Sequence, residues 1–172
     1  MDYRIEALDV LLHEDCILER YLPLIPYKER LIDSLRQRRC LTKSQCQVLS
    51  DDLLLEMGLP DGMMVGLFRR FLVMYDVKNS KMKEIDLLAE DAAEAASFRA
   101  LYLLPGVKAT RARLYCAAGY RTLERIAAAD PEQIIRETSD AILRNGWTLK
   151  APAPKEVRTH IAVAKALTVY AA

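Results

Sequence analysis

The sequence predicts an all-α fold made of two small helical bundles, and three observations lead to that prediction. Apolar residues recur at helical spacing in almost every segment, and no stretch alternates apolar and polar residues for long enough to form a strand. Capping residues or prolines precede most of the periodic runs. The composition also fits a folded chain, because 52% of the 172 residues are hydrophobic and 28% are charged, which argues against wholesale disorder.

Apolar spacing defines the first two helices. Ile5, Leu8 and Leu12 mark one face of the first helix, and such a stripe packs against a core. Pro26 suits the first turn of a second helix, because the first turn has no partner for the N–H that proline lacks. Leu31 is expected to point inward from that second helix.

Three capping signals complete the first bundle. Thr42-x-x-Gln45 has the form of a capping box that opens a short helix. In a capping box, the side chain of each of the two residues accepts a hydrogen bond from the backbone N–H of the other. Ser50 is placed to cap the helix DDLLLEM, which Gly58 is placed to end. Asp61 is placed to begin the helix that follows.

The polar stretch VKNSKMKE at 77–84 is the predicted boundary between a domain of residues 1–76 and a domain of residues 77–172. Turn-forming residues gather in this stretch, which is typical of a linker. A long alanine-rich helix over 83–103 is expected to follow it and to end at a proline-glycine turn, because alanine favours helix.

Four further helices are expected in the second domain. Gly119 is placed to stop the first of them, since glycine adopts the left-handed conformation of a helix C-terminus at little cost. A proline at the first helical position marks the later starts. The expected starts are, in chain order, Lys108, Thr122, Asp130 and Pro154.

The charge is unevenly distributed along the chain. Residues 1–76 hold ten Lys and Arg against thirteen Asp and Glu, a net charge of −3, whereas residues 77–172 hold fifteen against eleven, a net charge of +4. Residues 99–125 contain a single carboxylate, Glu124, and six cations: Arg99, Lys108, Arg111, Arg113, Arg121 and Arg125.

A tight turn, LPGV at 104–107, lies at the centre of this basic stretch. Proline restricts the chain to the turn and glycine permits the backbone conformation that the turn needs. Backbone N–H groups at the start of the next helix, together with the helix dipole, attract anions. We therefore predict a site for nucleic-acid phosphates formed by Gly106, Val107, Lys108, Thr110, Arg111 and Arg113.

The stretch LPGVKATRARLYCAAGYRTLERIAAADPEQI resembles the helix-hairpin-helix domains of DNA repair and recombination proteins. It is most similar to an uncharacterised bacterial family with paired units of this type. The likeness covers residues 93–170 and includes the proline-started last helix, APAPKEVRTHIAVAKAL. The matching positions are Leu104, Pro105, Gly106, Val107, Ala112, Leu114, Ala118, Gly119, Thr122, Leu123, Asp130, Pro131 and Glu132.

The resemblance implies contact between the hairpin and DNA phosphates, with one departure. DNA-binding members usually have a second glycine two residues after the first, and Lys108 occupies that position here. Its side chain either shields the amides or contacts phosphate itself, and members with imperfect hairpins serve as protein-docking or structural units. Residues 1–76 are more loosely similar to sterile-alpha-motif domains through LSDDLLLEMGLPDGMMVGLFRRFL, which implies a five-helix bundle for self-association or docking.

Enzyme, metal and membrane functions have no support in the motifs. No phosphate-loop, dinucleotide, nucleophile-elbow or zinc-protease motif occurs, so we expect no catalytic residue, cofactor or metal. The four cysteines form no C-x-x-C pair, and buried thiols are the expected state. No apolar run approaches the roughly 20 residues needed to span a membrane. Because the opening MDYRIEALDV is acidic and lacks the pattern of a secretory signal, we expect a cytoplasmic protein.

Two functional hypotheses remain. The first is a non-catalytic module that binds duplex DNA or another nucleic acid through its phosphates, without sequence preference. The alternative is a protein-interaction or assembly scaffold that docks a protein partner or another copy and makes no nucleic-acid contact. Trp147, which follows Asn145-Gly146, is either a docking residue or a side chain folded over the core, and we interpret it as structural.

Overall fold

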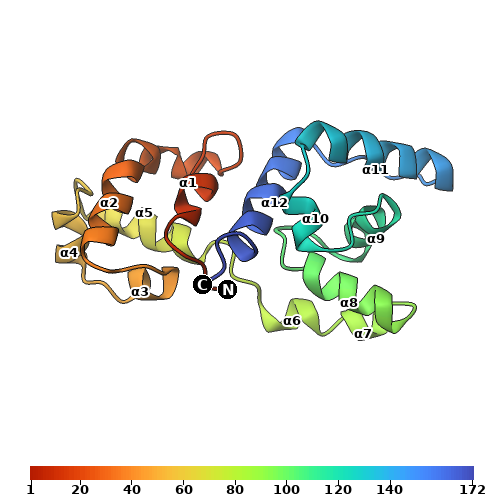
Figure 1. Cartoon of the computed structure of the whole chain (residues 1–172), viewed down its shortest axis with the longest axis horizontal. Coiled ribbons are helices and arrows are strands. Elements are labelled where there is room, and N and C mark those ends of the chain that lie inside the picture. The colour runs from red at the N-terminus through yellow and green to blue at the C-terminus, as the bar shows by residue number, and fades with distance from the viewer. The chain divides into compact units, whose positions relative to one another are not determined.

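The computed structural model describes residues 1–172, and all its regular elements are helices, so the predicted all-α class is confirmed (Figure 1). The only strand-like pairings are two isolated bridges, Tyr3 with Ala171 and Arg4 with Thr42. None of the helices combines the length and the apolar composition that crossing a membrane requires. The chain divides into two compact units, Met1–Asp76 with Lys165–Ala172 (unit 1) and Val77–Ala164 (unit 2).

Unit 1 packs its helices around η1 and α5. It contains α1 (Ala7–Leu11), the 3-10 helix η1 (Glu19–Tyr27), α2 (Lys28–Gln37), α3 (Lys43–Gln47), α4 (Asp51–Glu56) and α5 (Gly62–Val73). Helix α5 lies against η1, α3 and α4, and α2 lies against η1 and α1. At the centre, Tyr21 of η1 meets Phe71 of α5 edge-on, with ring centroids 5.7 Å apart, a geometry that aromatic pairs favour.

The expected role of Pro26 is wrong, whereas the caps of unit 1 are confirmed. Pro26 lies inside η1, and α2 starts two residues later at Lys28. The tight 3-10 turns of η1 accept its two prolines, which an α-helix interior would not. The capping box of Thr42 with Gln45 is present, and Ser50 accepts a hydrogen bond from the Leu53 N–H at 3.2 Å. These caps set where the short helices begin.

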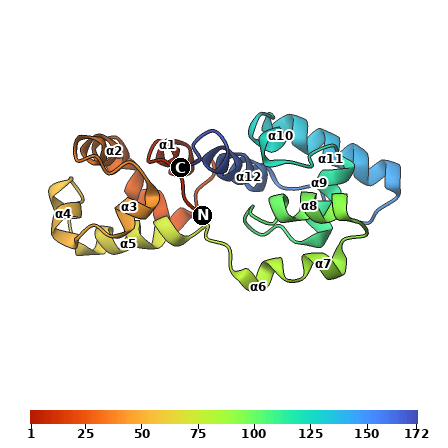
Figure 2. The same cartoon turned by 60° about the horizontal axis from the view of Figure 1, so that its bottom comes forward.

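Unit 2 surrounds α9 with α8 and α11 (Figure 2). It contains α6 (Asn79–Met82), α7 (Ile85–Leu88), α8 (Ala92–Leu101), α9 (Ala109–Ala117), α10 (Leu123–Ala127), α11 (Pro131–Asn145), and α12 (Pro154–Leu167) up to Ala164. Fully buried side chains from these helices form its core, among them Phe98, Tyr115, Ile126 and Val157. The α9 helix is therefore central to unit 2, and the turn before it is held by the same core.

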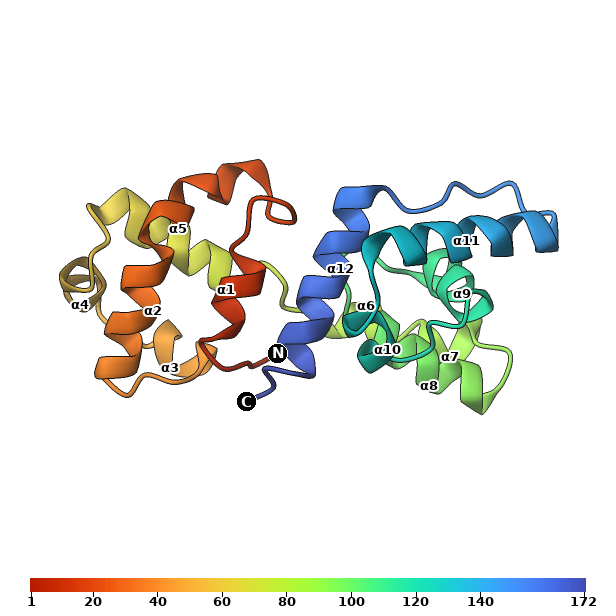
Figure 3. The same cartoon turned by 45° about the horizontal axis from the view of Figure 1, so that its top comes forward.

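The long alanine-rich helix expected over 83–103 is wrong, because the chain forms two helices there. Helix α7 ends at Leu88 and α8 starts at Ala92. Asp91 adopts an extended conformation with φ −149°, and its carboxylate accepts a hydrogen bond from the Glu94 N–H at 2.8 Å. An aspartate that caps a new helix in this way stops the previous one. The polar stretch before it contains the single turn of α6 (Figure 3).

The last residues of the chain group with the first ones. The Arg4 N–H donates to the Tyr170 carbonyl at 2.8 Å, and the Arg4 guanidinium donates to the Val169 carbonyl at 2.7 Å. These bonds place Lys165–Ala172 in unit 1, although α12 begins in unit 2.

Candidate nucleic-acid interface

The hairpin, residues 102–108 between α8 and α9, presents its glycine outward. The side chains of Leu104 and Val107 are fully buried, and the Val107 N–H donates to the Leu104 carbonyl at 3.2 Å. Between them, Gly106 is exposed with φ +72°, and no atom lies within 4 Å of the position that a Cβ would occupy. Apolar anchors therefore hold the turn while its tip faces open space.

The N-terminus of α9 has no side-chain cap. Lys108 occupies the N-cap position in an extended conformation with φ −126°, and its side chain makes no capping hydrogen bond. The N–H groups of Gly106, Lys108 and Thr110 have no acceptor in the chain. All three residues are exposed. Unsatisfied N–H groups at the positive end of a helix are the arrangement that an anion completes.

A buried histidine holds the hairpin from behind. The Nε2 atom of His160 lies 2.8 Å from the Pro105 carbonyl oxygen, and its Nδ1 atom lies 2.6 Å from the Tyr115 hydroxyl. Burial lowers the pKa of His160, so the neutral ring is favoured. In that form Nε2–H donates to Pro105 and Nδ1 accepts from Tyr115. Every polar atom of the ring is satisfied, and the hairpin carbonyl is tied to α12.

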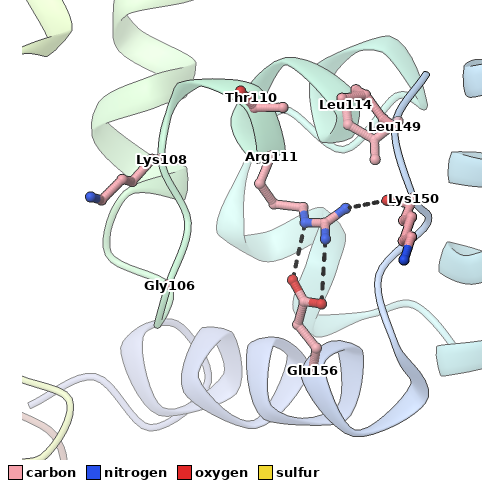
Figure 4. Close-up of a pocket in the computed structure, with 8 residues that line it drawn as sticks. All are labelled: Gly106, Lys108, Thr110, Arg111, Leu114, Leu149, Lys150 and Glu156. Carbon is pink, nitrogen blue, oxygen red and sulfur yellow. Dashed lines mark hydrogen bonds and ion pairs between the residues drawn. The ribbon is translucent and has the colours of Figure 1, made fainter. Parts of the chain in front are cut away.

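Arg111 is engaged in an internal ion pair (Figure 4). Its Nε lies 3.0 Å from Oε1 of Glu156, its Nη2 donates to Oε2 at 3.4 Å, and its Nη1 donates to the Lys150 carbonyl at 3.1 Å. Only 22% of the Arg111 side chain is exposed. This two-point pairing neutralises both charges and joins α9 to α12 and to the loop that precedes α12.

Arg113 is also engaged, on the opposite side of α9. Its Nη2 donates to the Leu88 carbonyl, and its Nε lies 3.6 Å from Oε1 of Glu94. The guanidinium carbon lies 5.7 Å from the ring centroid of Phe98, within reach of a cation–π contact. Arg113 therefore joins α9 to α7 and α8, and its charge is matched by a carboxylate.

The structure brings four of the six predicted residues together around one pocket of about 310 Å³. The pocket is lined by Gly106, Lys108, Thr110, Arg111, Leu114, Leu149, Lys150 and Glu156 (Figure 4). In the close-up, the Lys108 side chain extends away from Arg111 (Figure 4). Val107 is absent from the pocket because its side chain is in the core, and Arg113 lines a second, neighbouring pocket.

Lys81 is a cation of the hairpin that sequence reasoning missed. Its Nζ donates to the Leu104 carbonyl at 3.1 Å and lies 5.7 Å from the ring centroid of Tyr102. Burial, and next the positive charge of Lys108, lower the pKa of Lys81. Neither lysine is within ion-pair distance of a carboxylate. Lys81 lies in the stretch expected to be a linker, so no sequence signal pointed to it.

Two further residues of the site come from α12. No sequence pattern pointed to Glu156, because it lies 45 positions after Arg111 and only folding brings the two residues together. His160 did carry one, because it shares the buried face of α12 with Val157 and Ala164, and a polar residue on an apolar face needs hydrogen-bond partners.

No group of three or more His, Cys, Asp or Glu side chains is arranged to hold a metal ion. All four cysteines are buried, as expected. Comparison of the chain with models of protein families, with curated proteins and with solved structures finds no match. The resemblance to helix-hairpin-helix and sterile-alpha-motif domains therefore stays a prediction.

Proposed function

We propose that the chain is a non-catalytic binding module whose unit 2 contacts nucleic-acid phosphates through the hairpin, without sequence preference. The observation that carries the proposal is the uncapped N-terminus of α9. There, free N–H groups of Gly106 and Lys108 share an exposed surface with an ammonium that has no carboxylate partner. Backbone amides and lysines are groups that bind phosphate without reading bases.

The cations divide into two roles in this proposal. Arg111 and Arg113 act as structural ties, because each is paired with a carboxylate of the same unit. Lys108 and Lys150 are exposed and are the side chains assigned to phosphate. Lys108 takes the place where a second hairpin glycine is usual in the family that the sequence resembles. A glycine there lets the nucleic-acid backbone come close to the hairpin, whereas Lys108 prevents that close approach and supplies a positive charge.

A binding titration at two salt concentrations tests the proposal. Labelled duplex and single-stranded oligonucleotides are titrated with the protein, and anisotropy is measured. If about three phosphates are neutralised, affinity should fall about 20- to 40-fold between roughly 50 and 200 mM salt, because counterions are released on binding. Absence of binding at low salt would contradict the proposal.

A matched pair of variants locates the contact. Lys108→Ala combined with Lys150→Ala removes two charges from the hairpin surface, and it should weaken binding and flatten the salt dependence. Arg70→Ala combined with Arg39→Ala removes the same charge from exposed positions in unit 1, since Arg38 is already paired with Glu56. Equal loss of affinity in the two double variants would assign the effect to net charge and not to the hairpin.

Protein docking is the second candidate, and the pairing of both arginines favours it. With Arg111 and Arg113 neutralised, the hairpin surface is less basic than the sequence alone suggests. Exposed apolar residues such as Leu87, which is 86% exposed, supply a surface for a protein partner. Light scattering across a concentration series, together with a nuclease-treated pull-down, distinguishes this candidate from the first.

A further inference from the structure

A second pocket lies beside the hairpin surface. It has a volume of about 260 Å³ and is lined by Thr110, Arg113, Trp147, Thr148 and Leu149. Two of its residues, Thr110 and Leu149, also line the hairpin pocket. The two pockets are therefore neighbours that share two lining residues.

The position of the aromatic side chain in this pocket is set by the backbone on both sides. Gly146 ends α11 with φ +62°, and the Trp147 N–H donates back to the Ile142 carbonyl at 3.1 Å. Three residues later, the Lys150 carbonyl accepts from Arg111 at 3.1 Å. Arg111 thus holds the loop of residues 147–150 against α9, and Trp147 is half-buried beside the first turn of that helix.

The chemistry of the pocket suits a flat, neutral group joined to an anion. It offers one indole ring, two threonine hydroxyls, and an arginine whose charge is already balanced by Glu94. No carboxylate lines it. The neighbouring pocket is lined by Lys150 and by Lys108, whose side chain extends away from Arg111 (Figure 4), and its one carboxylate, Glu156, is paired with Arg111. An aromatic platform next to a positive groove is the arrangement that binds single strands.

We infer that this pocket takes an unpaired nucleobase, stacked on Trp147, while the adjoining phosphate occupies the hairpin pocket. The inference rests on the proposed function and names its substrate class as single-stranded nucleic acid. A base within a duplex keeps both faces covered by its neighbours, so it has no free face for the indole ring. Stacking on an aromatic side chain does not discriminate between bases, in keeping with binding that has no sequence preference.

The intrinsic fluorescence of the protein tests this, because Trp147 is the single tryptophan in the chain. Three probes of about ten nucleotides are titrated at low salt: oligothymidylate, an abasic strand with the same phosphates, and a duplex. We expect oligothymidylate to quench the fluorescence and to bind about 10-fold more tightly than the abasic strand, the gain that one stacked base supplies. The abasic strand and the duplex should bind with little quenching.

Variants give an independent readout by anisotropy of a labelled strand. Trp147→Ala should lower the affinity for oligothymidylate to that for the abasic strand, whereas Leu143→Ala, at an exposed position on α11 outside both pockets, should change neither. Equal binding of both strands by the wild-type protein would overturn the inference and leave the proposed function standing. Failure of all three probes to bind would overturn both. The wild-type comparison holds even if Trp147→Ala fails to fold.

Discussion

Two helix-to-helix corners in this molecule share a backbone design and differ in electrostatics. In unit 1, Gly58 turns the chain with φ +112°, and Asp61 caps α5 by accepting from the Met64 N–H at 2.9 Å. In unit 2, Gly106 turns the chain with φ +72°, and Lys108 stands at the cap position of α9 without a capping bond. The first helix start is satisfied by its own carboxylate. The second is left open and carries a cation.

The difference teaches that a glycine turn before a helix does not itself make an anion site. The N–H groups at the start of α5 have an internal acceptor, so a phosphate there would compete with Asp61. At the start of α9, the N–H groups of Gly106, Lys108 and Thr110 have no such competitor, and only the Ala109 N–H faces a side-chain oxygen, the buried Tyr102 hydroxyl. The support behind the corners differs too: the Met57 carbonyl accepts only a long 3.4 Å bond from Ser34, whereas the Pro105 carbonyl accepts from buried His160 at 2.8 Å.

The largest expected effect comes from breaking the support of the second corner. His160→Leu leaves the Pro105 carbonyl and the Tyr115 hydroxyl without partners in the core, and it should lower the free energy of unfolding by about 3 kcal/mol. Ser34→Ala, the matched change at the first corner, should cost less than about 1 kcal/mol. Urea denaturation measures both. A His160→Leu variant as stable as Ser34→Ala would show that the histidine does not hold the hairpin.

Exchanging the cap residues should separate binding from stability. Lys108→Asp makes the second corner resemble the first, and we expect an approximately 100-fold loss of nucleic-acid affinity at low salt from the reversed charge. The same change should raise the free energy of unfolding by about 0.5–1 kcal/mol through the new cap. Asp61→Ala should do the opposite, costing about 1 kcal/mol of stability with no effect on binding. Unchanged affinity of Lys108→Asp would contradict the assignment of phosphate to the hairpin.

The pH dependence of stability should reveal the buried histidine. Because burial holds the pKa of His160 below its ordinary value of 6.5, the unfolded chain binds the proton more readily than the folded one. Its contribution is complete above pH 6.5 and is lost as the pH falls toward the folded-state pKa, by up to about 1.4 kcal/mol per pH unit. The groups that influence this ring are Glu156, Arg111, Lys81 and Tyr115.

The measurement is a difference between two proteins across pH 5 to 8. Wild type should lose stability on acidification more steeply than His160→Leu, since both share every other titrating group. Parallel curves would mean that His160 is not buried in its neutral form.

The smallest expected effect concerns the ion pair behind the hairpin. A double-mutant cycle with Arg111→Ala and Glu156→Ala should give a coupling energy of about 1 kcal/mol, since the pair is two-pronged and partly shielded from solvent. The first corner has an ion pair of its own, between Arg69 of α5 and Asp51 of α4. Arg30 and Asp61 form no ion pair, so a control cycle with Arg30→Ala and Asp61→Ala should give no coupling. A coupling energy near zero for Arg111 and Glu156 would mean that Glu156 does not neutralise Arg111, and that the charge of Arg111 is available to a phosphate.

Local signals in the sequence predicted local structure well. The capping box at Thr42 and the cap at Asp61 act within three residues, and both are present as expected. Asp91 has the same capping pattern, but the alanine-rich stretch around it favoured the prediction of one continuous helix over 83–103. The exposed turn at Gly106 also followed from its own residues.

The partners of the arginines could not be predicted in the same way. Glu156 meets Arg111 across 45 positions, and Glu94 meets Arg113 only because α8 folds back on α9. A run of cations in a sequence reports charge, whereas the free charge of a site depends on which carboxylates the fold brings to it. Lys81 was missed for the same reason, since its bond to the Leu104 carbonyl exists only in the folded unit.

The tie between His160 and the Pro105 carbonyl spans 55 positions of chain, and this has a consequence for synthesis on the ribosome. When the hairpin leaves the exit tunnel, the helix that fixes it has not yet been translated. Until residue 160 emerges, the Pro105 carbonyl is bonded to water and Arg111 lacks its carboxylate. The surface that meets a ligand is therefore among the last features of unit 2 to mature, although the residues at its tip are made much earlier.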